Sequence, residues 1–239
     1  MRTTIGIISD IHLAPDGHPP ASWHNPYPLA RARQMLRAAV DRCRAAGVDA
    51  VVLLGDLTHA GDAPSIAAVV ASVASLACPV HILPGNHDLA QPAATLREIV
   101  ARGGAHLALA PAVVSPGEGV RLATVMLEPL ASRGGIRGLD LPAIAADDAL
   151  VIFTHFPLLE TQERLRERGF PHPGDLHNRL DLAAALAARA APTVIVHGHL
   201  HVRDAWCDGR VLQLGCAALI EPPHEVGFIE VERDPAGGL

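Results

Sequence analysis

Side chains of the kinds that bind metal ions follow short apolar segments at five places in this chain. The residues at these places are Asp10 and His12, then Asp56, then Asn86, His87 and Asp88, then His155, and finally His197, His199 and His201. Imidazole is the commonest metal ligand, and imidazole mixed with carboxylate or amide oxygen, without thiolate, suits Mn, Fe, Zn or Co better than Ca. These residue types therefore predict a metal site with nitrogen and oxygen ligands.

Each motif also has an ordinary structural explanation when it stands alone. The segment 85–88 contains residues that favour turns, Asp10 is of a type that caps helices, and a single His155 could be a core histidine. Three histidines within residues 197–201, however, indicate a metal site on their own. In an extended Asp-x-His segment, Asp10 and His12 would point the same way, so that one ion could bind both.

The apolar segments predict the strands that must position these side chains. Continuously apolar stretches, which are typical of buried strands, occur at 4–9, 51–54, 80–83, 150–153 and 193–196. Apolar residues at helical spacing occur at 29–46, 63–77, 93–102 and 180–190, and shorter strand-like segments occur at 105–109, 120–127, 210–214 and 227–231. Strands that alternate with helices favour parallel sheets, and the carboxyl ends of parallel strands meet at one edge of a sheet. We expect the motifs to gather at that edge.

Three segments without periodicity adjoin the motifs. Residues 14–28 contain five prolines and could be either a substrate-facing lid or a plain surface insertion. Residues 160–177, with His172 and His177, are charged and rich in Pro and Gly, and we expect a loop near the same edge. The Gly-rich segment 132–138 could hold phosphate oxygens or be an ordinary turn.

Length and composition limit the class of protein. With 239 residues, of which 49% are hydrophobic and 18% charged, we expect one globular domain over 1–239. No apolar run approaches the roughly 18 residues of a membrane span, and the first strand is too short for a signal peptide. Four scattered cysteines fit reduced thiols, so we expect a cytoplasmic protein. A net charge of -6 and an aromatic content of 3% argue against a nucleic-acid partner.

The motifs together resemble the signature of the calcineurin-like metallophosphoesterase superfamily. In order they read Asp-x-His, Gly-Asp, Gly-Asn-His-Asp, His and Gly-His-x-His, and they extend from residue 10 to residue 201. The versions Ser-Asp-x-His, Gly-Asp-Leu-Thr and Gly-Asn-His-Asp are similar to those of the cyclic-nucleotide phosphodiesterase-like branch. This resemblance implies a mixed α/β (α+β) fold, namely a four-layer αββα sandwich in which two mixed sheets lie face to face with helices outside.

The resemblance also implies a centre of two divalent or mixed-valence metal ions, with Mn, Fe or Zn favoured. One ion would be held by Asp10, His12 and His201, the other by Asn86, His155 and His199, and Asp56 would bridge them. His87 would stabilise the developing charge or protonate the leaving oxygen. Asp88 would orient His87 or its loop, and His197 would be an outer partner of a ligand or structural rather than a ligand.

The implied function is metal-dependent hydrolysis of a small phosphodiester, such as a cyclic nucleotide or cyclic phosphate, by attack of a metal-bridging hydroxide. A phosphomonoesterase or a nucleotide pyrophosphatase could use the same centre and is the alternative. The negative net charge and the low number of aromatic residues disfavour a nuclease. A non-catalytic scaffold would be expected to have lost ligands, whereas every motif here is filled.

Overall fold

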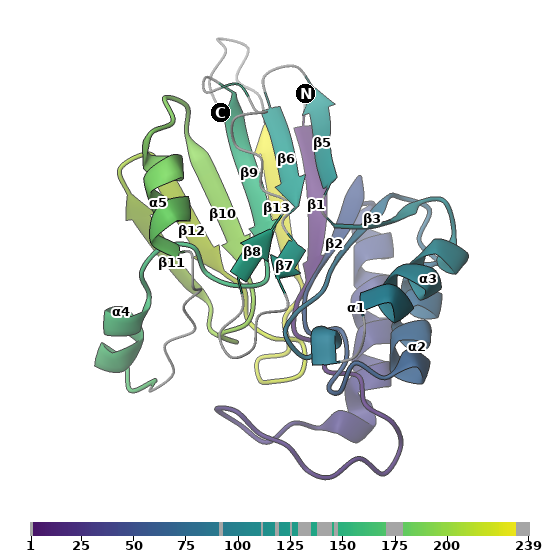
Figure 1. The fold of residues 1–239 in the computed structure, drawn as a ribbon. Coiled ribbons are helices and arrows are strands. Elements are labelled where there is room, and N and C mark those ends of the chain that lie inside the picture. Colours follow the sequence, from purple (N-terminus) through teal and green to yellow (C-terminus); the bar gives the residue numbers. More distant parts are fainter. Residues whose placement is uncertain are drawn as a thin grey trace.

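Two β-sheets lie face to face in the computed structural model, with helices on the outer side of each sheet (Figure 1). The structure describes residues 2–90, 93–110, 112–117, 120–124, 126–128, 135–137, 145, 148–170 and 179–232. This arrangement confirms the predicted four-layer sandwich.

The first sheet has the strand order β13-β1-β2-β3-β4. Its strands are β1 (Arg2–Ile8), β2 (Ala50–Leu54), β3 (Val80–Leu83), β4 (Leu107–Leu109) and β13 (Gly227–Glu232), of which only β13 runs antiparallel to its neighbour. Its outer face is covered by the helices α1 (Ala32–Ala46), α2 (Ala63–Val73) and α3 (Ala93–Gly103) (Figure 1). A 3-10 turn, Leu29–Arg31, leads into α1, which ends at Gly47 in the left-handed conformation (φ 62°) that glycine tolerates.

The second sheet has the strand order β11-β12-β10-β9-β6-β5. Its strands are β5 (Ala112–Gly117), β6 (Val120–Thr124), β9 (Ala149–Thr154), β10 (Thr193–His197), β11 (Asp204–Asp208) and β12 (Val211–Gly215). The helices α4 (Gln162–Glu167) and α5 (Arg179–Ala187) lie on its side of the molecule, and β7 (Met126–Glu128) pairs antiparallel with β8 (Gly135–Arg137) (Figure 1).

The central strands are apolar throughout because both of their faces are buried. In β2, Val52 and Leu54 pack between the two sheets, whereas Val51 and Leu53 pack against the helices. Phe153 of β9 faces Val52 and Leu54 across the space between the sheets and is 1% exposed. Burial on both faces fixes the strand register, and with it the direction of the loops that leave the strand ends.

Several predicted boundaries differ from the structure. The expected loop at 160–177 includes α4, so that prediction is wrong for 162–167, where Gln, Glu, Arg and Leu are good helix formers. Residues 171–178, which contain His172 and His177, lie outside the described residues, as do 132–134 and 138 of the Gly-rich segment. β11 was not predicted because four of its five side chains are exposed and it lacks a buried apolar face. Among the described helices, none combines the length and apolar character that crossing a bilayer requires.

Candidate metal centre

The predicted site residues gather in loops at the carboxyl ends of strands from both sheets, namely β1, β2, β3, β9 and β10. Asp10, His12, Asp56, Asp88, His155, His199 and His201 are each at most 7% exposed. His87 is half-buried and Asn86 is exposed. His197, the last residue of β10, is also buried, and its Nδ1 donates to the carbonyl oxygen of Gly198 at 2.9 Å.

The first group of potential ligands is Asp10, His12 and His201, whose ligand atoms lie within 4.8 Å of one another. His201 Nε2 is 3.3 Å from Asp10 Oδ1. His12 Nε2 is buried and makes no hydrogen bond to any described residue. The three side chains thus lie close together, and His12 Nε2 is left without a hydrogen-bond partner among the described residues.

The second group is Asp56, His155 and His199, again with ligand atoms within 4.8 Å. His155 Nε2 lies 3.4 Å from Asp56 Oδ2 and 3.3 Å from Asn86 Oδ1. The same Asp56 oxygen lies 3.6 Å from His12 Nε2, which belongs to the first group. Asp56 therefore lies between the two groups.

The backbone turns sharply at five of these residues. Asp10 (φ 52°), His12 (47°), Asp56 (46°), His199 (65°) and His201 (57°) have positive φ, and the only other non-glycine among the described residues that does so is His224. The strand-like Asp-x-His geometry expected for residues 10–12 is therefore wrong, because β1 ends at Ile8. Left-handed backbone at a non-glycine residue is unfavourable by about 1–2 kcal/mol, and it persists where the surroundings enforce it.

Hydrogen bonds between the loops hold these turns. The backbone N–H of Asp10 donates to the Gly55 carbonyl at 3.1 Å, and that of His12 donates to the Asp56 carbonyl at 2.9 Å. A Cβ atom at Gly85 would overlap the Asp56 carboxylate, so this position requires glycine. The loops after β1, β2 and β3 thus form one closely packed unit.

Opposite charges are paired in this cluster when no ion is bound. Burial disfavours a charge on His155, but Asp56 outweighs this effect and raises the pKa of His155 to about 9. Burial likewise opposes a charge on His201, but Asp10 and Glu221 raise its pKa to about 10. Burial alone would raise the pKa of Asp10, yet His201 lowers it to about 2. Both histidines must release a proton before they can bind an ion.

Two other histidines are kept neutral. Burial lowers the pKa of His12 to about 3, and burial together with His155 also lowers the pKa of His199. A neutral imidazole offers a nitrogen lone pair to a metal. Ligand atoms 3.3–3.6 Å apart leave room for an ion bonded to each at about 2.0–2.2 Å. The residues present therefore fit a centre of two divalent ions.

Comparison with known families agrees with this geometry. The family model of calcineurin-like phosphoesterases matches residues 3–203, which is most of the chain. The chain belongs to the calcineurin-like phosphoesterase family. Members of this family hydrolyse phosphoesters at a dinuclear metal centre. A comparison with curated proteins gives no match.

Solved structures of three phosphoesterases share the fold of this calcineurin-like phosphoesterase. A dimetal phosphatase from Danio rerio has 17% identity and a TM-score of 0.68, with 95% of this chain and 91% of that chain covered. Phosphopantetheinyl hydrolase from Mycobacterium tuberculosis has 14% identity and a TM-score of 0.60, with 100% and 99% covered. A purple acid phosphatase from yellow lupin has 14% identity and a TM-score of 0.62, with 96% and 49% covered. At these identities the likeness concerns the fold.

The two residues predicted to assist catalysis have different surroundings. The ring of His87 is half-buried beside His12, with 4.7 Å between the ring centroids. The carboxylate of Asp88 is buried and accepts hydrogen bonds from the backbone N–H groups of Gly85 (2.8 Å), Leu57 (3.0 Å) and Thr58 (2.9 Å). Asp88 thus connects the loops after β2 and β3.

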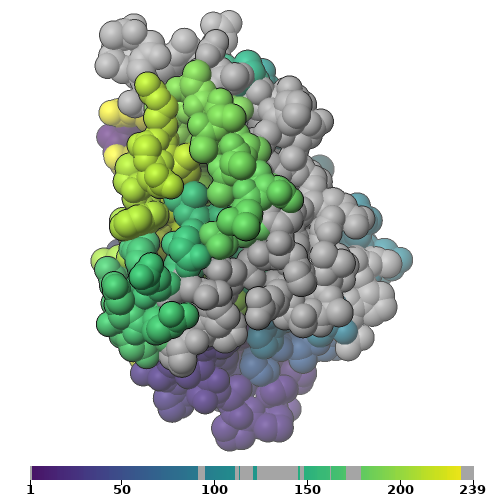
Figure 2. Space-filling model, turned by 60° about the vertical axis from the view of Figure 1, so that its left-hand side comes forward, coloured from purple at the N-terminus to yellow at the C-terminus, as the bar shows by residue number. Residues whose placement is uncertain are grey.

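The loop 14–28 lies against the metal-ligand groups. Trp23 stacks on His201 with 5.9 Å between the ring centroids, and the ring centroids of Tyr27 and His12 are 5.0 Å apart. Figure 2 shows this loop (purple) at one end of the molecule, next to the segment around α4 (green). In agreement with this view, the ring centroids of His24 and Phe170 are 4.5 Å apart. The loop 14–28 therefore packs against predicted ligands of the centre.

Two residues near the centre were missed from the sequence, Glu221 and His59. Glu221 is 2% exposed, and its carboxylate faces both His201 and the loop 14–28. His59 lies three residues after Asp56, and its ring packs against those of His12 and His87. Neither residue belongs to a recognisable motif. Their proximity to the centre arises from tertiary packing.

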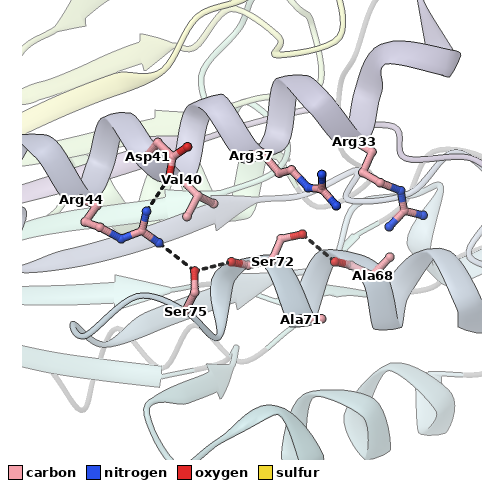
Figure 3. A pocket seen from close by; sticks show the side chains of 9 residues that line it. All are labelled: Arg33, Arg37, Val40, Asp41, Arg44, Ala68, Ala71, Ser72 and Ser75. Atoms are coloured by element: carbon pink, nitrogen blue, oxygen red, sulfur yellow. Dashed lines mark hydrogen bonds and ion pairs between the residues drawn. The ribbon is translucent and has the colours of Figure 1, made fainter.

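A separate hollow of about 410 Å³ lies between the outer surfaces of α1 and α2 (Figure 3). It is lined by Arg33, Arg37, Val40, Asp41, Arg44, Ala68, Ala71, Ser72 and Ser75. Arg44 pairs with Asp41 within α1, and its guanidinium donates to Ser75 Oγ, two residues beyond the end of α2, at 2.9 Å. The hollow contains none of the predicted site residues.

Proposed function

We propose that this protein hydrolyses a small phosphodiester, such as a cyclic nucleotide or cyclic phosphate, with two divalent or mixed-valence ions of Mn, Fe or Zn. The proposed ligands of one ion are Asp10, His12 and His201, those of the other are Asn86, His155 and His199, and Asp56 contacts both. The observation that carries this proposal is the position of Asp56 Oδ2, 3.4 Å from His155 Nε2 and 3.6 Å from His12 Nε2. One carboxylate oxygen is thus within reach of both ligand groups.

Two such ions, when bound, would polarise the phosphoryl oxygens and supply a strong nucleophile from water at neutral pH. The part played by the protein is to hold the ligand atoms in place before substrate arrives. Burial of the ligands and the backbone hydrogen bonds between their loops support this role. The chemistry requires no serine or cysteine nucleophile.

His87 is proposed to donate a proton to the leaving oxygen or to stabilise the charge that develops there. Its backbone N–H donates to Asp56 Oδ1 at 3.0 Å, and its ring Nδ1 donates to the carbonyl oxygen of His59 at 2.7 Å. Because Nδ1 is occupied, Nε2 is the nitrogen that can reach a substrate. Asp88, whose carboxylate is held by backbone N–H groups, is proposed to position this loop rather than to touch the substrate.

Aromatic side chains at the centre support an organic group with a flat ring. Trp23, Tyr27 and Phe156 all lie against histidines of the two ligand groups, although the chain has only seven Trp, Tyr and Phe residues. Trp23 and Tyr27 are only half-buried. Base–aromatic stacking is worth about 1–3 kcal/mol per base, so a nucleotide would gain affinity here.

The alternative is a phosphomonoesterase or nucleotide pyrophosphatase, since the same ligands would serve either reaction. The preference for diesters rests on the similarity of the motifs at Asp10, Asp56 and Asn86 to cyclic-nucleotide phosphodiesterase-like proteins. We further propose that the chain acts as a single domain in the cytoplasm on a small phosphoester rather than on nucleic acid.

The deciding experiment compares bis-p-nitrophenyl phosphate with p-nitrophenyl phosphate at matched pH in the presence of Mn²⁺. Faster hydrolysis of the diester supports the proposal. Clearly faster hydrolysis of the monoester favours the phosphatase alternative. Failure of the metal-loaded protein to hydrolyse either ester, or a panel of cyclic nucleotides, would favour a non-catalytic scaffold.

A further inference from the structure

We propose that His59 is a positioning residue of the metal centre, which orients His12 through its side chain and His87 through its backbone carbonyl. This inference rests on the proposed function, since it assigns His12 as a ligand and His87 as the group that acts on the leaving oxygen. It concerns a residue outside the motifs that identified the centre.

The first observation concerns the two ring nitrogens of His12. His12 Nε2 faces the ligand cluster, 3.6 Å from Asp56 Oδ2, whereas His12 Nδ1 lies 3.2 Å from His59 Nδ1. A neutral imidazole that binds an ion through Nε2 carries its proton on Nδ1. His12 Nδ1–H therefore donates to His59 Nδ1, which accepts, and His59 carries its own proton on Nε2. This hydrogen bond holds the lone pair of His12 Nε2 toward the ion.

The second observation concerns the backbone of the same residue. The carbonyl oxygen of His59 lies 2.7 Å from His87 Nδ1. A carbonyl can only accept, so Nδ1 of His87 carries a proton and its ring orientation is fixed by this bond. His59 thus contacts a proposed ligand with its side chain and the proposed proton donor with its main chain.

The loop that carries His59 is held firmly enough for this role. The backbone N–H of His59 donates to the Leu13 carbonyl at 2.9 Å, and Thr58 Oγ1 accepts from the N–H of Gly61 at 3.0 Å and donates to Asp88 Oδ1 at 2.9 Å. A Cβ atom at Gly61 would lie 2.9 Å from the Asp88 carbonyl oxygen, so the loop passes close to residues 87–88. His59 is therefore fixed relative to both of its partners.

A third ion is the competing explanation for this arrangement. His12, His59 and His87 also have ring nitrogens within 4.8 Å of one another. An ion among them would need the lone pair of His12 Nδ1, while the first ion needs that of His12 Nε2. Neutral His12 has only one lone pair, so the hydrogen bond is the arrangement compatible with two ions.

The test compares three variants. His59→Ala removes the side-chain acceptor but leaves the backbone carbonyl, whereas His59→Asn can place an amide oxygen near the position of Nδ1. His18→Ala is the matched control, because His18 contacts the His59 ring (4.8 Å between centroids) and its own Nδ1 donates to the Pro19 carbonyl. The dissociation constants for Mn²⁺ are measured by competition with a chelating indicator.

Loss of the outer partner of a metal-binding histidine typically weakens metal affinity 10–100-fold. We expect a loss of about this size for one ion in His59→Ala, a much smaller loss in His59→Asn, and none in His18→Ala. With Mn²⁺ at saturation, His59→Ala should regain most of its kcat, because the carbonyl that orients His87 remains. Rescue by asparagine separates positioning from general destabilisation.

Several outcomes overturn the inference. Equal affinity for Mn²⁺ in His59→Ala and wild type would exclude the side-chain role, as would a loss in His59→Asn as large as that in His59→Ala. A third equivalent of metal that binds wild type but not His59→Ala would make His59 a ligand instead. If the variants do not fold, ¹H–¹⁵N spectra of the zinc-loaded wild type test the proposal instead. The proposal requires a proton on Nε2 of His59 and on Nδ1 of His12, and any other tautomer would contradict it. If wild type binds metal without hydrolysing any phosphoester, the proposed function fails, but the affinity comparison remains valid.

Discussion

The carboxylate of Glu221 faces the ring of His201, with Glu221 Oε2 3.4 Å from His201 Nδ1. The other oxygen, Oε1, accepts hydrogen bonds from the backbone N–H groups of His24 at 3.1 Å and Asn25 at 3.0 Å. One buried carboxylate therefore connects a proposed metal ligand with the loop 14–28. Because both contacts depend on the same side chain, the order of the loop and the affinity for metal should change together.

We predict that Glu221→Ala weakens binding of one ion about 10–100-fold and frees the loop. Hydrogen exchange at the amides of His24 and Asn25 should accelerate, because both lose their acceptor. Glu225→Gln is the control, since Glu225 lies on the same segment but pairs with Arg203. Unchanged exchange in Glu221→Ala would show that other contacts hold the loop.

Asp56→Asn or His199→Ala should lower metal occupancy and nearly abolish hydrolysis. Each substitution removes a proposed ligand, and in Asp56→Asn the oxygen between the two groups loses its charge. The fold should largely survive, because the strands that carry these loops are buried on both faces. Metal content and turnover are measured on the purified variants, with the exposed Asp208→Asn as a control. Full activity with one ion or none would contradict the dinuclear mechanism.

His87→Ala should lower kcat/KM in proportion to how much the leaving oxygen needs a proton. General acid catalysis typically contributes roughly 10² to 10⁴ in rate, so a loss in this range is expected for a ribose oxygen as leaving group. The loss should be much smaller for p-nitrophenolate, and metal content should stay near that of wild type. Equal losses on both substrates would exclude the general-acid role and leave charge stabilisation.

His81→Leu should make the protein more resistant to acid. His81 lies in β3 between Val52 and Ala108, burial lowers its pKa, and its Nδ1 is buried without a hydrogen bond to any described residue. In the unfolded chain the pKa of His81 is about 6.5. As the pH falls below this value, the unfolded chain binds more protons at His81 than the folded chain does, so the free energy of unfolding falls as well.

The measurement is urea denaturation between pH 7 and pH 5, with a chelator present so that metal binding adds no pH dependence. The advantage of His81→Leu over wild type should increase as the pH falls through this range. Parallel curves for the two proteins would mean that His81 is protonated to the same extent in the folded and unfolded states.

The position of a candidate ligand could be predicted from the sequence where the residue directly follows an apolar strand, as His155 follows β9. There the strand fixes the position of the side chain, so a local pattern is enough. Prediction from the sequence failed for the conformation of Asp10 and His12, because the left-handed turns after β1 depend on hydrogen bonds to residues 55 and 56. No local pattern could reveal such contacts.

Glu221 and His59 could not be found from spacing for a related reason. Glu221 meets residues 24 and 25 across almost the whole length of the chain, and its role is evident only from the packed structure. His59 contacts His12 and His87 because three loops meet at one sheet edge. The outer partners of the proposed centre are set by tertiary contacts, whereas the proposed ligands themselves are marked by strand ends.

The left-handed turns at the proposed ligands place function and thermal robustness in opposition. Asp10, His12, Asp56, His199 and His201 each hold a backbone conformation that glycine would adopt with less strain. The backbone strain taken by itself would favour glycine at these positions, whereas the proposed chemistry requires the ligand side chains. A library of this protein selected only for heat resistance should consequently accumulate inactive variants, with the substitutions concentrated at the ends of β1, β2 and β10.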